Sequence, residues 1–258
     1  MQRSFFEPAG PGSYLATAAT EGPWSPGAQH GGPPSALAAR ELERHEPAGH
    51  MRLASVTVDI LRPVPVGVLT ARTRTLRPGK RVALLETVLE AGGQEVLVAR
   101  GWRTATLADA PVVARVGALP QLPETEQPPV FPGASVAGYL SHIEWRFESG
   151  SFAEPGPCTA WARPRIPLLP DEDLHPMSRS LLLADSGNGM SMVLDPRSYL
   201  FLNVNLTVVL QRDPAGEWLR LEATSTMGGT GTGLAETQLS DTNSPVGIGT
   251  QTLLISPR

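Results

Sequence analysis

Between Arg179 and Pro196 the sequence RSLLLADSGNGMSMVLDP is apolar on nearly every side of a helix, with one carboxylate, Asp185, inside it. A helix that is apolar all round is expected to be buried, and a buried Asp is expected to have a partner or a task. Gly187 and Gly189 each weaken such a helix by roughly 1 kcal/mol relative to Ala, so a neighbouring backbone or a ligand is expected close by. The pattern predicts a central helix enclosed by other elements.

Alternating, strand-like runs fill most of the remaining sequence. A second helix is predicted from Ser35 to His45, after a Pro pair that suits a first helical turn. The separators RPVPVG, RPGK and AGGQ between the first of these runs carry the turn residues expected of antiparallel hairpins. The predicted strands are a short one within Gly12–Ala19, then Leu53–Leu61, Val68–Leu76, Val82–Ala91, Glu95–Thr106, Tyr139–Phe147, Thr159–Ile166, Tyr199–Leu210, Trp218–Thr226, Gly233–Leu239 and Val246–Ile255.

The two halves of the chain align with each other without a gap, at a constant offset of 150 residues, from about Val56 to the C-terminus. Under this offset Gly79 meets Gly229, and Glu86-Thr87 meets Glu236-Thr237. The agreement of strands and turns predicts an internal duplication of a unit with one helix and one antiparallel sheet. We expect a first unit at 1–106, a proline-rich linker at 107–137 and a second unit at 138–258.

Composition narrows the classes of partner. The chain of 258 residues has a net charge of -4 and no run of basic residues, which argues against nucleic acid and anionic membrane surfaces as partners. No long apolar stretch or leader-like N-terminus is apparent, so we expect a cytoplasmic protein without a membrane partner. The single cysteine, Cys158, cannot form an internal disulfide. No spacing of His, Cys and carboxylates indicates a metal, and no cofactor is expected.

The duplication also serves as a filter for functional residues. Residues that maintain the fold should recur in both halves, whereas a site present once should not. Three polar residues are peculiar to the second half: Asp185 falls opposite Ser35 or Ala36, Thr224 opposite Arg74, and Gln251 opposite Gly101. Each has a structural alternative, because Thr is common in strands and Gln suits an exposed strand position. As a set they indicate one site per chain.

A helix enclosed by an antiparallel sheet, present twice in one chain, resembles the α+β double hotdog fold of the type II, TesB-like acyl-CoA thioesterases. The resemblance is most specific in LLLADSGNG around Asp185, LEATSTM around Thr224 and VGIGTQTLL around Gln251. In that family an Asp on the second helix, a Thr or Ser on a following strand and a Gln on the last strand hold the attacking water. The resemblance therefore implies these roles for Asp185, Thr224 and Gln251, with Ser225 and Thr226 as rival hydroxyls.

Hydrolysis of a thioester needs an activated water and donors for the developing oxyanion. Asp185 could act as general base or orient the water, and a direct anhydride route through its carboxylate is also open. For the oxyanion, the candidates are the backbone N–H groups around His30, Gly31 and Gly32, because glycines permit close approach and a helix N-terminus favours negative charge. The alternative is that these glycines only shape a tight helix start.

Three functions fit these patterns. The first is an acyl-CoA thioesterase-like hydrolase, acting on acyl-CoA or a carrier-bound acyl thioester and possible as a homodimer. The second is a hotdog-fold lyase, isomerase or cyclase of a polyketide-type pathway, since one fold hosts several chemistries. The third is a non-catalytic acyl-binding protein. Four arginines, Arg72, Arg74, Arg100 and Arg103, either meet the phosphates of CoA or form solvated strand faces.

Overall fold

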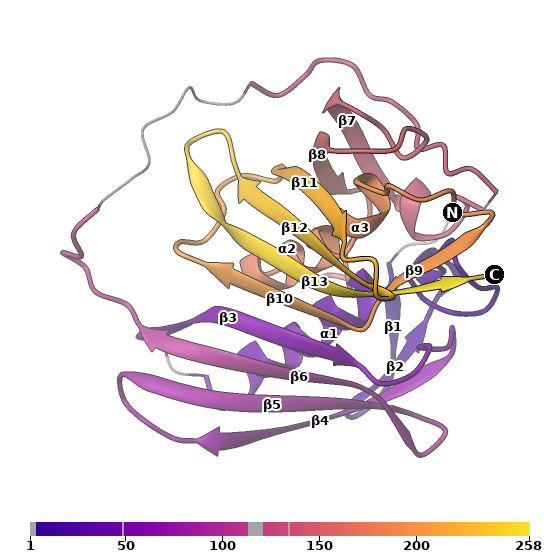
Figure 1. Ribbon diagram of the computed structural model, residues 1–258. Coiled ribbons are helices and arrows are strands. Elements are labelled where there is room, and N and C mark those ends of the chain that lie inside the picture. The colour runs from indigo at the N-terminus through magenta and orange to yellow at the C-terminus, as the bar shows by residue number, and fades with distance from the viewer. Residues whose placement is uncertain (1–3, 48, 113–120, 134) are drawn as a thin grey trace.

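The computed structural model describes residues 4–47, 49–112, 121–133 and 135–258 (Figure 1). The first half contains β1 (Phe6–Gly10), β2 (Ser13–Ala16), the short 3-10 helix η1 (Ala18–Thr20), α1 (Gly32–Arg44), β3 (Met51–Ile60), β4 (Val68–Arg77), β5 (Val82–Ala91) and β6 (Gln94–Ala105). The second half contains the 3-10 helix η2 (Tyr139–His142), β7 (Ile143–Ser149), β8 (Cys158–Pro164), α2 (Pro176–Ala184), α3 (Gly187–Met190), β9 (Tyr199–Asn203), β10 (Asn205–Leu210), β11 (Leu219–Met227), β12 (Thr232–Ser240) and β13 (Pro245–Pro257).

One antiparallel sheet runs through both halves, in the order β1-β2-β4-β5-β6-β3-β10-β13-β12-β11-β8-β7, with β9 paired to β13. Reading inward from β1, the last four strands of the first half follow in the order β4-β5-β6-β3. Reading inward from β7, their counterparts follow in the same order, β11-β12-β13-β10. The last four strands of the first half, β3 to β6, recur as β9/β10, β11, β12 and β13 at an offset of 150 residues. The sheet therefore joins two copies of one unit through β3 and β10, as the duplication predicts.

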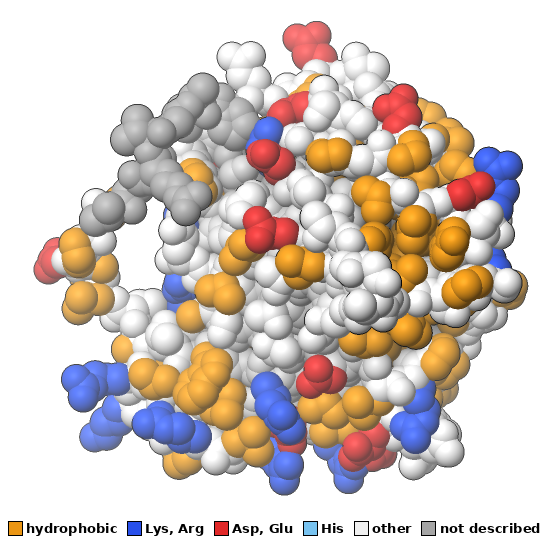
Figure 2. All heavy atoms as spheres, viewed as in Figure 1, with side chains coloured by type: hydrophobic (Ala, Val, Ile, Leu, Met, Phe, Trp, Pro, Cys, Tyr) orange, Lys and Arg blue, Asp and Glu red, His pale blue; other side chains and the backbone are white. Residues whose placement is uncertain are grey.

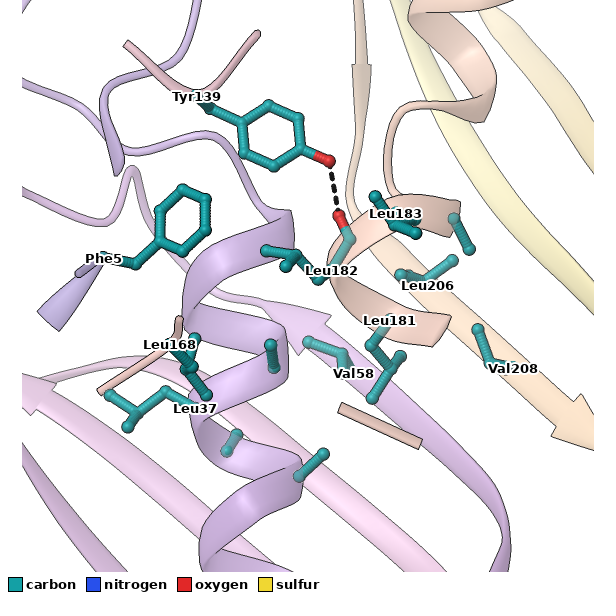
Figure 3. Close-up of a cluster of buried hydrophobic side chains, with 14 of the residues drawn as sticks. Phe5, Leu37, Val58, Tyr139, Leu168, Leu181, Leu182, Leu183, Leu206 and Val208 are labelled. Atoms are coloured by element: carbon teal, nitrogen blue, oxygen red, sulfur yellow. Dashed lines mark hydrogen bonds between the residues drawn. The ribbon is translucent and has the colours of Figure 1, made fainter. Parts of the chain in front are cut away.

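The sheet curves around two helices, α1 and α2, which lie side by side between the halves (Figure 1). They run antiparallel, because Gly32 at the start of α1 approaches Leu182 near the end of α2, whereas Glu43 near the end of α1 contacts His175 before α2. Apolar side chains of both helices and of β3 and β10 form one buried cluster (Figure 3). The core is thus shared by both units.

The central helix differs from the predicted Arg179–Pro196. It begins at Pro176 and ends at Ala184, and after a turn at Asp185 and Ser186 a second short helix, α3, covers Gly187–Met190. Asp185 is therefore the C-terminal cap of α2 rather than a residue inside a helix. The first helix also begins earlier than predicted, at Gly32, since prolines are tolerated in a first turn that needs no N–H donors.

Several strand boundaries also differ. The predicted strand Tyr199–Leu210 is divided at Val204, where the Asn205 side chain accepts a hydrogen bond from the Thr252 N–H and replaces a ladder bond. The expected strand at Tyr139 begins with η2, and β1 was not predicted. The described parts of the expected linker, 107–112, 121–133 and 135–137, contain no helix or strand, and 113–120 and 134 lie outside the described residues.

The arginines considered for CoA phosphates do not form a free basic site. Arg74 and Arg100 both pair with Glu86 on the outer face of the sheet, and Arg72 pairs with Glu90. In Figure 2 basic side chains gather over the sheet of the first unit, along the lower part of the view. Arg103 is buried and donates to main-chain carbonyls at the end of α1. These contacts favour structural roles.

Candidate active site

Asp185 lies where the two units meet, and its residue is only 2% exposed. One carboxylate oxygen, Oδ1, accepts a hydrogen bond from Nδ2 of Asn203 at 2.7 Å. The other, Oδ2, lies 2.9 Å from Nδ1 of His30. The first unit supplies the histidine and the second supplies the carboxylate and the amide. Two donors from separate segments thus hold the carboxylate in one orientation.

The His30 ring is fixed between Asp185 and an aromatic ring. It stacks on Tyr139 with a centroid distance of 3.9 Å and an interplanar angle of 17°. The hydroxyl of Tyr139 donates to the Leu182 carbonyl at 2.7 Å, the bond drawn in Figure 3. Burial raises the pKa of Tyr139 well above its usual range, so its hydroxyl remains a donor. Tyr139 therefore ties the histidine to the end of α2.

The protonation of His30 follows from its neighbours. Nδ1 lies 3.1 Å from the Gly32 nitrogen as well as 2.9 Å from Asp185. A bare Nδ1 would point its lone pair at a carboxylate oxygen, so the tautomer with hydrogen on Nδ1 is favoured. In that tautomer Nδ1 donates to Asp185. The Gly32 N–H also points at Nδ1, so it is directed at the ring rather than at an acceptor outside this cluster.

Gly31 and Gly32 are required by close approach at this point. A Cβ on Gly31 would lie 2.8 Å from Oδ2 of Asp185, and a Cβ on Gly32 would overlap the carbonyl oxygen of Leu182. Both residues are at the start of α1, where backbone N–H groups have no partner within the helix. The predicted glycine pair therefore lies directly beside the predicted Asp, and close packing explains both glycines.

Gln251 lies beside the backbone of the Asp185 turn. Its Nε2 donates to the Asp185 carbonyl at 3.2 Å, and its Oε1 accepts from the Asn188 N–H at 3.1 Å. The residue is 2% exposed and connects β13 to the break between α2 and α3. A Cβ on Gly187 would overlap the hydroxyl of Thr237 and lie 3.2 Å from Gln251 Oε1. The glycine in the broken helix thus makes room for the sheet.

Thr224, which the sequence analysis assigned to the site, does not lie in this cluster. It lies on the outer face of β11, is exposed and pairs with Glu236 across the strands. Side chains alternate between faces along a strand, so the buried neighbour is Ser225, whose hydroxyl lies 2.8 Å from that of Ser191. Thr224 was expected in the site because of its place after Glu222-Ala223, and the pairing of β11 puts its hydroxyl on the outer face of the sheet.

Asn203 is the polar partner that the sequence analysis missed. Under the 150-residue offset it falls opposite Leu53, an apolar residue. The comparison of halves that selected Gln251 against Gly101 could therefore have selected Asn203 as well. An uninterrupted strand Tyr199–Leu210, as the pattern predicts, gives Asn203 no special place, whereas the structure ends β9 at this residue.

The equivalent position in the first unit is filled with apolar side chains. A Cβ on Gly101, the counterpart of Gln251, would lie 2.8 Å from Cδ2 of Leu53 and 2.9 Å from Cδ1 of Leu42. Leu53 is itself the counterpart of Asn203. Leucines thus replace the amides of the second unit, which explains how duplication leaves a single polar centre of this kind.

The structure also bears on two other kinds of chemistry, metal binding and a reactive thiol. Among the described residues no group of three or more His, Cys, Asp or Glu side chains could hold a metal ion. Burial raises the pKa of Cys158 to about 12, helped by the nearby Glu154, so its thiol is protonated near neutral pH. In the part of the chain that the structure describes, no helix is long and apolar enough to cross a membrane.

A curved antiparallel sheet around a central helix, repeated in tandem and fused into one sheet, defines a double hotdog protein. Two sequence families match the halves: the acyl-CoA thioesterase N-terminal domain over residues 20–104 and the acyl-CoA thioesterase C-terminal domain over residues 117–255. The chain belongs to the type II, TesB-like acyl-CoA thioesterase family, and is a thioester hydrolase of that family.

Solved structures share the fold along nearly the whole chain. A protein provisionally assigned as a thioesterase II from Thermobifida fusca YX has a TM-score of 0.74 and 18% identity, covering 97% of this chain and 95% of its own. The acyl-CoA thioesterase II TesB2 of Mycobacterium marinum has a TM-score of 0.70 and 15% identity, covering 98% and 96%. A hot dog fold protein of unknown function from Alicyclobacillus acidocaldarius has a TM-score of 0.74 and 15% identity, covering 95% and 93%. No curated protein matches the sequence.

Proposed function

We propose that the chain hydrolyses acyl-CoA thioesters at Asp185, with a water molecule as the nucleophile. The observation that carries the proposal is the buried carboxylate, held by His30 and Asn203 beside the glycine pair that starts α1. Each carboxylate oxygen has two lone-pair sites, so Asp185 can accept a proton from water while keeping both donors. Family membership supplies the reaction class, and this geometry supplies the candidate base.

In the proposed reaction, water attacks the thioester carbonyl while Asp185 accepts its proton. The carbonyl oxygen becomes an oxyanion at the start of α1, where the N–H group of Gly31 and the helix dipole favour negative charge. Collapse of the tetrahedral intermediate breaks the carbon–sulfur bond, and the proton on Asp185 passes to the leaving thiolate. Acid and free thiol are the products.

Two residues act through Asp185 rather than on the substrate. His30 donates from Nδ1 to the carboxylate, so its side chain orients the base. Its backbone N–H, one of the expected oxyanion donors, donates to the Thr20 carbonyl at 2.8 Å. Gln251 bonds to the Asp185 carbonyl and the Asn188 N–H and fixes the turn that carries the carboxylate. We therefore assign Gln251 a positioning role in place of direct contact with the water.

The test is thiol release from a panel of acyl-CoAs by the wild type and Asp185→Asn. The amide keeps the shape but cannot accept the proton, so kcat/KM should fall about a hundredfold or more. The matched control is Asp195→Asn, because Asp195 is an exposed carboxylate on the segment after α3 and should tolerate the change. Equal hydrolysis by wild type and Asp185→Asn would refute the assignment.

The water route is tested by a single turnover in ¹⁸O-labelled water, followed by mass spectrometry of the peptide that contains Asp185. Direct attack by water places the label in the released acid and leaves the protein unlabelled. Label in the Asp185 carboxylate would show an acyl-aspartyl anhydride instead and overturn the general-base proposal.

A further inference from the structure

A row of aromatic rings begins next to the candidate base and leads away from it. Phe201 lies on β9 two residues before Asn203, so the two side chains share one face of the strand. Trp24 packs edge-on against Phe201 with centroids 4.8 Å apart, and Phe131 packs edge-on against Trp24 at 5.2 Å. Phe152 follows at 6.1 Å from Phe131. The rings connect the site to the edge of the second unit.

Three of these rings, those of Trp24, Phe131 and Phe152, come from segments without helix or strand. Trp24 is in the loop that leads to His30, and Phe131 is in the segment that joins the two units. Within 121–133 Phe131 is the one buried residue, while its neighbour Val130 is 64% exposed. Phe131 thus anchors an otherwise exposed segment by inserting its ring between Trp24 and Phe152.

The acyl chain of a bound thioester needs an apolar space next to Asp185. It could extend from Asp185 in one of two directions. One is the core between the helices, where Leu181, Leu206 and their neighbours pack within helices and strands (Figure 3). Opening that core would separate α1, α2 and β10 and would leave a cavity, which is costly in a close-packed interior. The other is the aromatic row, where Trp24 and Phe131 lie outside helices and strands, so that moving their side chains does not require helices and strands to separate.

We propose that Trp24 and Phe131 set the acyl-chain length that the enzyme accepts, because their rings occupy the apolar row into which the acyl chain of a bound thioester extends. The inference rests on the proposed function, since it takes Asp185 as the reacting centre. Phe201 then contacts the first carbons of the chain, and Trp24 and Phe131 limit how far the chain extends. Smaller side chains at these two positions should lengthen the space.

The test is the chain-length profile of kcat/KM for saturated substrates from butanoyl-CoA to hexadecanoyl-CoA. In Trp24→Ala and Phe131→Ala the substrate with the highest kcat/KM should be a longer acyl-CoA than in the wild type. For the longest accepted substrates, kcat/KM relative to butanoyl-CoA should rise about tenfold, because each additional buried methylene favours binding. The matched control is Trp102→Ala, since Trp102 is 39% exposed on the outer face of β6 and should leave the profile unchanged.

A second measurement keeps the inference testable if an alanine variant folds poorly. Affinities of non-hydrolysable S-alkyl-CoA thioethers are measured by calorimetry for Trp24→Phe, Phe131→Leu and the wild type, after thermal melting has shown each to be folded. The smaller side chains should raise the affinity for long alkyl chains and leave that for short ones unchanged. An identical length dependence in all three proteins would overturn the inference.

The outcomes separate this inference from the proposed function. If hydrolysis depends on Asp185 but Trp24→Ala and Phe131→Ala leave the chain-length profile of kcat/KM unchanged, only the role of Trp24 and Phe131 is refuted. Absence of acyl-CoA hydrolysis in the wild type refutes the proposed function itself.

Discussion

Thr57 and Thr207 lie directly opposite each other where β3 meets β10, with their hydroxyl oxygens 3.0 Å apart, and their numbers differ by 150. Each is therefore the counterpart of the other under the duplication. A pseudo-twofold axis passes between them, and the pairs on either side, such as Leu206 with Val58, follow the same symmetry. The offset found in the sequence is thus a symmetry operation of the fold.

The symmetry leads to a prediction about the first unit. Gly101→Gln places the second unit's glutamine at the equivalent position, where Leu53 and Leu42 leave no space for a Cβ. Overpacking should lower the free energy of unfolding by about 1 to 3 kcal/mol, measured by urea denaturation. Gly67→Gln is the control, because nothing lies within 4 Å of a Cβ at Gly67. Unchanged stability of Gly101→Gln would contradict the packing argument.

The sequence predicted those features that depend on periodicity and on the comparison of halves. Hairpins β4 to β6 and β11 to β13 belong to this group. Asp185 and Gln251, both selected by comparing the halves, do lie in contact, although Asp185 was expected inside a helix and lies at its C-terminal cap. The sequence did not predict the break at Asp185, because the break depends on Thr237 and Gln251 approaching Gly187 from distant strands. The face of Thr224 required knowing the register of β11.

The turn between β12 and β13 leads to a prediction about acid stability. Burial opposes the charge on Asp241, but Arg212 and the N–H groups of Ala215, Asn243 and Ser244 hold its pKa well below the usual range. Because the pKa of Asp241 is lower in the folded than in the unfolded state, its carboxylate contributes fully to the free energy of unfolding above about pH 4. This contribution is lost as the pH falls further. Asp241→Asn should lower the free energy of unfolding at pH 7 by about 2 kcal/mol.

The measurement for Asp241 is urea denaturation across pH 3 to pH 7. The difference between wild type and Asp241→Asn should narrow toward pH 3, whereas the exposed control Asp109→Asn should follow the wild type throughout. A constant difference at every pH would show that the loss comes from packing rather than from the charge.

Glu43 leads to a prediction of the opposite sign. Burial raises its pKa, although His175, whose Nδ1 contacts Oε1 of Glu43, and Arg103 act against this. Because the pKa of Glu43 is higher in the folded than in the unfolded state, its contribution to the free energy of unfolding is most favourable below about pH 4.3. This contribution is lost as the pH rises. Glu43→Gln should therefore stabilise the protein at pH 8 by about 1 kcal/mol, by removing a poorly solvated charge.

Thermal melting at pH 5 and pH 8 checks the Glu43 prediction, with the exposed Glu124→Gln as control. The gain in melting temperature should be larger at pH 8 than at pH 5, and activity toward acyl-CoA should stay unchanged because Glu43 lies at the far end of α1 from Gly31. A destabilised Glu43→Gln at pH 8 would mean that the ion pair with His175 outweighs the burial of the charge.

The last prediction separates two candidates for the third polar residue of the site. Thr224 is exposed on the outer face of β11, whereas Asn203 donates to Asp185 at 2.7 Å. Asn203→Ala removes one of two donors that orient the base, so kcat/KM for acyl-CoA hydrolysis should fall at least tenfold. For Thr224→Ala, kcat/KM should remain within about twofold of the wild-type value, because the side chain lies away from Asp185. The variant should also stay folded, since surface changes of this kind alter stability by less than about 0.5 kcal/mol. Asn203→Ser, which keeps a donor on a shorter side chain, should fall between the wild type and Asn203→Ala. If Thr224→Ala is the more damaging change, then the hydroxyl on β11 acts in the reaction and β11 must present its outer face to the substrate.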